Sequence, residues 1–170
     1  DQSGSPLWNG PDFKMAKKET IQYEAKLTGL KSDTKYYYAV YNGEQRLTSS
    51  DKSYHFSTHP KIGSKQAMRF WVVGDSGTGG KMQQAVHQGM RAFTKKGKKI
   101  DFYMHVGDMA YGSGRDDEFS KNFFSMYETT LRNTVCWASM GNHEGYTADG
   151  QKAIGPYYDA YVLPSKAEAG

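Results

Sequence analysis

The sequence predicts an α/β protein, α+β overall, because an all-β segment precedes one in which strands and helices alternate. Residues 21–58 show the period-two alternation of antiparallel strands. From residue 69 onward, short apolar runs alternate with apolar stripes of helical spacing, which is typical of βαβ units and a parallel sheet. With 3 Trp, 8 Phe and 13 Tyr, the chain also has enough aromatic residues for a packed core.

Composition excludes several classes of protein. The mean hydropathy is −0.79, and no apolar run approaches the roughly 18 residues of a membrane span, so we expect none. Cys136 is the one cysteine, which excludes an internal disulfide framework and a four-cysteine zinc module. The net charge is +4, and four lysines within residues 95–99 form the one dense basic cluster. This cluster lacks interleaved aromatics and is typical of a solvated loop, so we expect no nucleic-acid partner.

Three antiparallel strands are predicted in the first segment. Residues 21–27 alternate apolar and polar side chains, and residues 36–40 and 54–56 do the same. The dipeptide Asn42-Gly43 favours a hairpin turn, because both residue types adopt positive φ easily. These strands are expected to have one half-buried face.

The second segment predicts three strands separated by two helices. The strands are expected over Arg69–Val73, Phe102–Val106 and Val135–Met140. The second helix is expected over Asp116–Arg132. In the first helix we expect an apolar stripe to face the core, formed by Met82, Val86, Met90 and Phe93.

Polar side chains follow each of these three strands directly. Asp75 follows the first, Asp108 the second, and Asn142 with His143 the third, each after a glycine that lets the chain turn sharply. Asp75, Asp108 and Asn142 lie 33 and 34 residues apart, near the roughly 30 residues of one βαβ unit. Because ligands bind beyond the carboxyl ends of parallel strands, we expect these side chains to meet at one edge.

The residue types at this edge are those of a metal site. Carboxylate and amide oxygens with an imidazole nitrogen suit hard or borderline divalent and trivalent cations. Taken singly, an Asp after a strand is commonly a turn or helix-cap residue. Three matched junctions on consecutive strands favour a shared metal site instead.

Two other motifs fit less well. Residues 74–77 are similar to the nucleophile loop of chymotrypsin-like proteases, but that fold is all-β and here a helix follows. Residues 74–81 are similar to a P-loop, but the spacing is one residue too long and Met82 replaces the magnesium-binding Ser or Thr. No Ser-His or Cys-His arrangement for nucleophilic catalysis is evident.

Three short motifs carry a family resemblance: Asp75-Ser76-Gly77 fits D-x-G, residues 107–111 fit G-D-x-x-Y, and residues 141–144 fit G-N-H-[DE]. In this order and spacing they closely resemble the first three of five motifs of the purple acid phosphatases, which are calcineurin-like metallophosphoesterases. The match runs from about Met68 to Pro164. Upstream, residues 27–36 are similar to the E–F corner of fibronectin type III-like sandwiches, which many purple acid phosphatases carry.

The resemblance implies hydrolysis of phosphate monoesters by a metal-bound hydroxide at a binuclear centre. Asp75 and Tyr111 would bind ferric iron, and Asp108 would bridge the two ions. Asn142 would bind a divalent zinc, manganese or iron ion and contact the substrate. His143 would lie beside the substrate phosphate and assist the leaving group.

Two further residues near the motifs have smaller expected roles. His105 lies inside the second strand of the second segment and is expected in the core or behind the ligands rather than on the metal. Glu144 is expected to orient His143 or to cap the segment that follows.

The sequence departs from the family in one respect: the motifs V-x-x-H and G-H-x-H, which supply three histidine ligands, do not occur in it. We therefore expect the middle piece of a longer enzyme, inactive alone. Residues 1–60 would end a fibronectin type III-like β-sandwich, 61–66 would be a linker, and 67–170 would begin a four-layer αββα catalytic domain. Its partners would be a phosphate ester and the missing C-terminal half of the enzyme. The family implies an extracellular, periplasmic or lysosomal location.

Two alternative functions stay open at this point. A non-catalytic binding or adhesion protein would retain the scaffold while having lost the histidines. A phosphodiesterase or nucleotidase of the same superfamily would share the motifs and differ in substrate.

Overall fold

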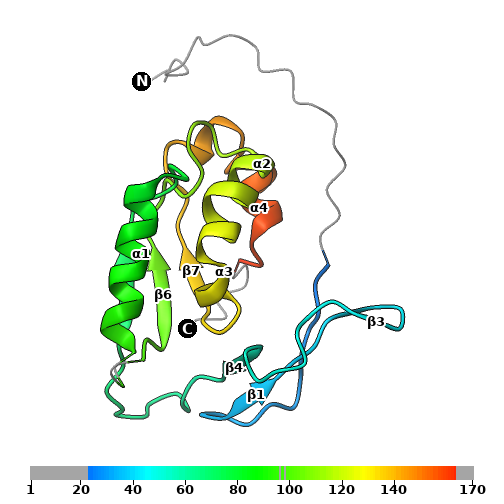
Figure 1. The fold of residues 1–170 in the computed structure, drawn as a ribbon. Coiled ribbons are helices and arrows are strands. Elements are labelled where there is room, and N and C mark those ends of the chain that lie inside the picture. The colour runs from blue at the N-terminus through cyan, green and yellow to red at the C-terminus, as the bar shows by residue number, and fades with distance from the viewer. Residues whose placement is uncertain (1–22, 96, 98, 164–170) are drawn as a thin grey trace.

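The computed structural model describes residues 23–95, 97 and 99–163, and has the mixed α/β architecture that the sequence predicts. A three-stranded parallel sheet carries helices on one face, and two small antiparallel strand pairs precede it in the chain (Figure 1). Lys96 and Lys98 of the basic cluster lie outside the described residues. Within these ranges, no helix has the length and apolarity needed to cross a membrane.

The parallel sheet confirms the three predicted strands and aligns their carboxyl ends. Its order is β5 (Phe70–Val73), β6 (Phe102–His105) and β7 (Cys136–Ala138). Val73 pairs with His105, and His105 pairs with Ala138, so the three strands end level with one another. The loops that follow them therefore leave the sheet at the same edge.

Both predicted helices are present, and the second contains a π-helical segment that its periodicity does not predict. In Figure 1, α1 and α3 lie in front of β6 and β7 and cover the same face of the sheet. The helical segments are α1 (Lys81–Thr94), α2 (Asp116–Glu118), the π-helix η1 (Phe119–Phe124), α3 (Ser125–Leu131), the 3-10 helix η2 (Glu144–Tyr146) and α4 (Pro156–Ala160).

The aromatic core lies between these helices and one face of the sheet. Trp71 of β5 stacks on Tyr103 of β6 with ring centroids 4.7 Å apart, and Tyr127 of α3 meets both rings edge-on. On the opposite face, Phe70 and Trp137 are 51% and 45% exposed. The described part of the chain thus buries one face of the sheet and leaves the other open.

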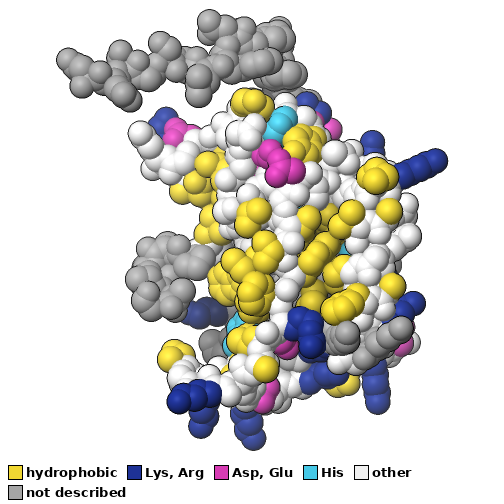
Figure 2. Space-filling view, turned by 90° about the vertical axis from the view of Figure 1, so that its left-hand side faces the viewer, with side chains coloured by type: hydrophobic (Ala, Val, Ile, Leu, Met, Phe, Trp, Pro, Cys, Tyr) yellow, Lys and Arg dark blue, Asp and Glu magenta, His cyan; other side chains and the backbone are white. Residues whose placement is uncertain are grey.

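The expectation that the apolar stripe of α1 faces the core is wrong. Met82 is 78% exposed and Val86 51% exposed, whereas Gln83 and His87 are the buried residues of the helix. Gln83 accepts a hydrogen bond from the N–H of Gly79 and donates one to a main-chain carbonyl of η1, and His87 pairs with a threonine of α3. Because these polar side chains find partners inside, the helix turns its apolar stripe outward. Hydrophobic side chains also gather on the face of the molecule that Figure 2 shows.

The antiparallel strands differ in part from those predicted. Residues 23–27 form no strand, and residues 21 and 22 lie outside the described residues. The second and third predicted strands are present as β1 (Lys35–Tyr37) and β4 (His55–Ser57), which pair with each other. The predicted Asn42-Gly43 turn is confirmed, since β2 (Tyr41–Asn42) and β3 (Gln45–Arg46) form a hairpin around it. The first run fails because its apolar residues have no face to pack on, and Tyr23 is 88% exposed.

Polar contacts attach these strands to the turn between α3 and β7. The side-chain amide of Asn133 donates to the carbonyls of Ser53 and His55 at 2.7 and 2.8 Å. Tyr38 donates to the carbonyl of Arg132 at 2.8 Å. This contact is at the amino ends of the parallel strands, far from the edge where the polar loops meet.

Candidate metal centre

Main-chain hydrogen bonds hold the loops after β5 and β6 together. The N–H of Asp75 donates to the carbonyl of Gly107 at 3.1 Å, and the N–H of Gly77 donates to the carbonyl of Asp108 at 3.0 Å. Further along, the N–H of Tyr111 donates to the carbonyl of Gly77 at 2.9 Å. The two loops therefore form one platform that carries Asp75, Asp108 and Tyr111.

Three oxygen donors converge on this platform. The hydroxyl of Tyr111 lies 3.3 Å from Asp75 Oδ1 and 3.3 Å from Asp108 Oδ2. Burial, together with the negative charge of Asp108 and Asp75, raises the pKa of Tyr111 to about 12, so without a cation the phenol keeps its proton. Two carboxylates and a phenol facing one another suit a hard cation, whose charge would favour loss of that proton. The donor set therefore fits one side of a metal centre.

The backbone of both aspartates is in the left-handed region. Asp75 has φ of 50° and Asp108 has φ of 57°, which costs a residue other than glycine about 1–3 kcal/mol and is commonly found at functional sites. The expected sharp turn at the preceding glycine is present at Gly107, with φ of 106°. Gly141 does not have a positive φ. It is required for another reason, because a Cβ there would overlap Asp108.

Glu144 ties the loop after β6 to the loop after β7. Its carboxylate is fully buried and accepts four main-chain hydrogen bonds. Oε2 accepts from the N–H of Asp108 at 2.8 Å and of Gly141 at 2.9 Å, and Oε1 accepts from Met109 and Ala110 at 2.8 and 3.0 Å. Glu144 thus fixes Asp108 relative to Asn142, a role different from orienting His143 or only capping the next segment.

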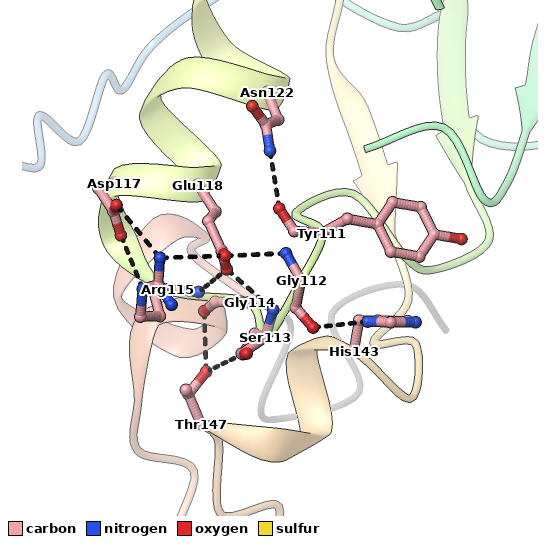
Figure 3. Close-up of polar contacts among 10 residues, drawn as sticks. All are labelled: Tyr111, Gly112, Ser113, Gly114, Arg115, Asp117, Glu118, Asn122, His143 and Thr147. Atoms are coloured by element: carbon pink, nitrogen blue, oxygen red, sulfur yellow. Dashed lines mark hydrogen bonds and ion pairs between the residues drawn. The ribbon is translucent and has the colours of Figure 1, made fainter. Parts of the chain in front are cut away.

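His143 is held at both its backbone and its ring. Its N–H donates to Asp108 Oδ1 at 3.0 Å, and its ring Nδ1 lies 2.7 Å from the carbonyl oxygen of Gly112 (Figure 3). Because a carbonyl only accepts, Nδ1 carries the proton, and Nε2 is left for another partner. The ring also packs edge-on against Tyr111, with centroids 4.3 Å apart. His143 is therefore beside the converging oxygens.

The structure contains a Ser-His pair that the sequence pattern does not reveal. Ser76 Oγ lies 2.8 Å from His105 Nε2 and accepts a hydrogen bond from Tyr127 at 3.0 Å. His105 is 1% exposed, and burial lowers its pKa to about 4. The pair anchors the loop that carries Asp75, and the burial of the imidazole confirms the expected core position of His105.

Asn142 lies in the loop after β7. It is exposed, and its two neighbours are both fixed: the N–H of Gly141 by Glu144 and the N–H of His143 by Asp108. All the sequence-predicted site residues thus lie at one edge of the sheet. Among the described residues, no cluster of three or more His, Cys, Asp or Glu side chains is placed to hold a metal ion.

The contacts of some supporting residues could not be predicted from the sequence. Glu144, Glu118 and Asn122 bind main-chain groups of the loops after β6 and β7. The sequence indicates the role of Glu118 only weakly. It is the third residue of helix α2, a position where a glutamate often closes a capping box. The usual Ser or Thr partner is replaced by Arg115, so the signature is missing.

Acidic and phenolic oxygens beyond the ends of parallel strands suit a metal-dependent hydrolase. The family model of the calcineurin-like phosphoesterases matches residues 68–168. The chain therefore belongs to the calcineurin-like phosphoesterase family, whose members are metal-dependent phosphoester hydrolases. No curated protein and no solved structure matches the chain.

Proposed function

We propose that this chain is part of a phosphomonoesterase with a binuclear metal centre, of the purple acid phosphatase kind. The observation that carries this proposal is the convergence of Tyr111 on Asp75 and Asp108, with His143 beside them. A phenol in that position separates this branch from most of its relatives.

Four residues of this chain would hold the ions. Asp75 and Tyr111 would bind one ion, Asp108 would bridge to the second, and Asn142 would bind the second. Ions bound there would neutralise the phosphate charge and supply hydroxide at neutral pH. The chain's own contribution is to fix the oxygens: the Glu144 carboxylate and the paired loops restrain them before any ligand arrives.

His143 is the proton donor in this proposal. Its Nδ1–H is bound by the carbonyl of Gly112, so a second proton, on Nε2, is the one that can be transferred. Passing that proton to the departing alkoxide avoids releasing a strong base. Asn142, next in the chain, would also contact the phosphate.

We further propose that residues outside this sequence complete the site with three histidines. The open face of the sheet supports this, because Phe70 and Val72 are 51% and 48% exposed on it. The resemblance implies that a second sheet would cover this face. It also implies that residues 1–60 would belong to a fibronectin type III-like domain.

The test begins with the coding sequence beyond Gly170. A G-H-x-H motif there supports the enzyme, and a stop codon supports a non-catalytic binding protein. The complete protein, loaded with Fe³⁺ and Zn²⁺, is then assayed on a phosphate monoester and a phosphate diester. Turnover of the monoester with little of the diester supports the proposal, and the reverse preference identifies a phosphodiesterase. Absence of both activities in the folded, metal-loaded protein contradicts it.

A further inference from the structure

The loop between Tyr111 and helix α2 contains the group that orients His143. The carbonyl of Gly112 accepts the Nδ1–H of His143 at 2.7 Å. This carbonyl belongs to the same peptide unit as the N–H of Ser113. In a trans peptide the C=O and N–H point in opposite directions, so what binds the N–H also determines where the C=O points.

Glu118 binds that N–H. Its Oε2 accepts from Ser113 at 2.9 Å and from Arg115 at 3.0 Å, and its Oε1 accepts from Gly112 at 2.8 Å (Figure 3). The carboxylate is 12% exposed and also pairs with the guanidinium of Arg115 at 3.2 Å. Glu118 thus accepts hydrogen bonds from three of the four N–H groups of residues 112–115, and the N–H of Gly114 donates to Ala110 instead.

Other contacts hold the rest of this loop but leave the Gly112 carbonyl to His143. Asn122 of η1 donates to the carbonyl of Tyr111 at 2.8 Å. Thr147 donates to the carbonyls of Ser113 and Gly114 at 2.9 and 2.8 Å. Each of these bonds acts on a peptide unit other than the one that joins Gly112 to Ser113.

We propose that Glu118 is a positioning residue for His143 and acts through the Gly112–Ser113 peptide unit. The negative carboxylate polarises the N–H, which makes the carbonyl at the other end of the peptide a stronger acceptor for Nδ1–H. This series of hydrogen bonds leads from the Glu118 carboxylate through the peptide unit to the imidazole of His143. It holds His143 in the tautomer that leaves Nε2 for the reaction. This inference rests on the proposed function of His143 and adds the group that prepares it.

Glu118→Gln is the test variant, because glutamine keeps the shape and removes the charge. In the complete metal-loaded protein we expect kcat for an alkyl phosphate to fall about tenfold to hundredfold, since general-acid catalysis contributes about 10²–10⁴-fold. Hydrolysis of p-nitrophenyl phosphate, whose leaving group needs no proton, should change little. Asp117→Asn is the matched control: Asp117 is 75% exposed and pairs with the same arginine. An equal fall for both substrates would mean general damage and would overturn the proposal.

A double-mutant cycle checks whether Glu118 acts through His143. In a His143→Ala background, Glu118→Gln should have no further effect on the alkyl phosphate. If the fold-losses in kcat of the two single variants multiply in the double variant, the proposal is overturned. Two residues that act through the same path should not have independent effects.

A second measurement does not depend on activity. Nitrogen-15 NMR of the metal-free complete protein should show the neutral ring of His143 protonated at Nδ1 in the wild type and in Asp117→Asn. Glu118→Gln should raise the fraction protonated at Nε2, and Glu118→Asp, which keeps the charge with a shorter reach, should fall between. Unchanged tautomers in folded Glu118 variants would overturn the proposal. If the wild type hydrolyses no phosphate ester, the proposed function fails while this tautomer comparison still decides the positioning role.

Discussion

Under the proposed function, binding of a metal ion would change the chemistry of Tyr111. Without metal, its phenol donates to two carboxylates, and its pKa is raised to about 12. A ferric ion would reverse that effect and bind the phenolate, and phenolate-to-iron charge transfer would then give a visible absorption band. We expect Tyr111→Phe to abolish this band in the complete iron-loaded protein, measured by absorption spectroscopy. Tyr158→Phe is the control, and a band that survives in Tyr111→Phe would disprove the ligand assignment.

Glu144 should be the most costly single polar residue to change at this edge. Glutamine in its place has one carbonyl oxygen, so about two of the four main-chain donors lose their partners inside the protein. At about 1–3 kcal/mol for each unsatisfied buried group, Glu144→Gln should lower the free energy of unfolding by about 2–6 kcal/mol. Urea denaturation measures the loss. Glu128→Gln, at an exposed ion pair with Arg132, should cost less than about 1 kcal/mol, and equal losses would refute the role of Glu144.

His105 should make stability depend on pH. Burial lowers the pKa of His105 from 6.5 to about 4. Between pH 4 and 6.5, His105 is therefore protonated in the unfolded chain and neutral in the folded protein. Stability from this residue is complete above pH 6.5 and is lost as the pH falls through 4, by about 3 kcal/mol in all. His105→Gln should therefore flatten the dependence of the urea midpoint on pH between 4 and 6.5. The exposed His59→Gln should leave the slope unchanged, and a wild-type slope in His105→Gln would contradict the prediction.

Helix α1 offers a direct comparison between the apolar pattern and the observed packing. The pattern favours Met82 as a core residue, whereas the structure buries Gln83, which bridges Gly79 and Asn122. Gln83→Ala should lower the free energy of unfolding by about 1–3 kcal/mol. Met82→Ala should change it by less than about 0.5 kcal/mol, because the side chain is largely in solvent. Chemical denaturation of the two variants shows which face of α1 is packed against the core. A larger loss of unfolding free energy for Met82→Ala would favour the apolar face.

The elements that the sequence predicts well are those whose signals are local. β5, β6 and the polar residues after them follow from short apolar runs ending at Gly74-Asp75 and Gly107-Asp108. The orientation of α1 could not be predicted, because the partners of its polar side chains lie in another helix. For Glu144 the sequence predicts an orienting or capping role. Its actual contacts could not be predicted, because it binds main-chain N–H groups, which every residue except proline has and which leave no mark on the sequence.

Asn133 is the residue by which the β1–β4 pair is most directly attached to the rest of the molecule. Its amide donates to two carbonyls of the chain around β4, at Ser53 and His55. We expect Asn133→Ala to let this segment open more often, because both bonds are lost at once. Hydrogen exchange of residues 53–57 should accelerate by about tenfold or more, with little change in β6. Exchange that rises equally in β6 would indicate general unfolding instead.

The four main-chain hydrogen bonds to the Glu144 carboxylate have a consequence for how the sequence of such a protein can evolve. The carboxylate holds the loop after β6 by main-chain atoms at Asp108, Met109 and Ala110. The side chains of Met109 and Ala110 belong to the buried core and take no part in these hydrogen bonds. Core substitutions of suitable volume can therefore accumulate at these two positions while Asp108 keeps its place at the end of the sheet. Within residues 108–110, two positions can therefore change with the core while the position of the Asp108 carboxylate is preserved.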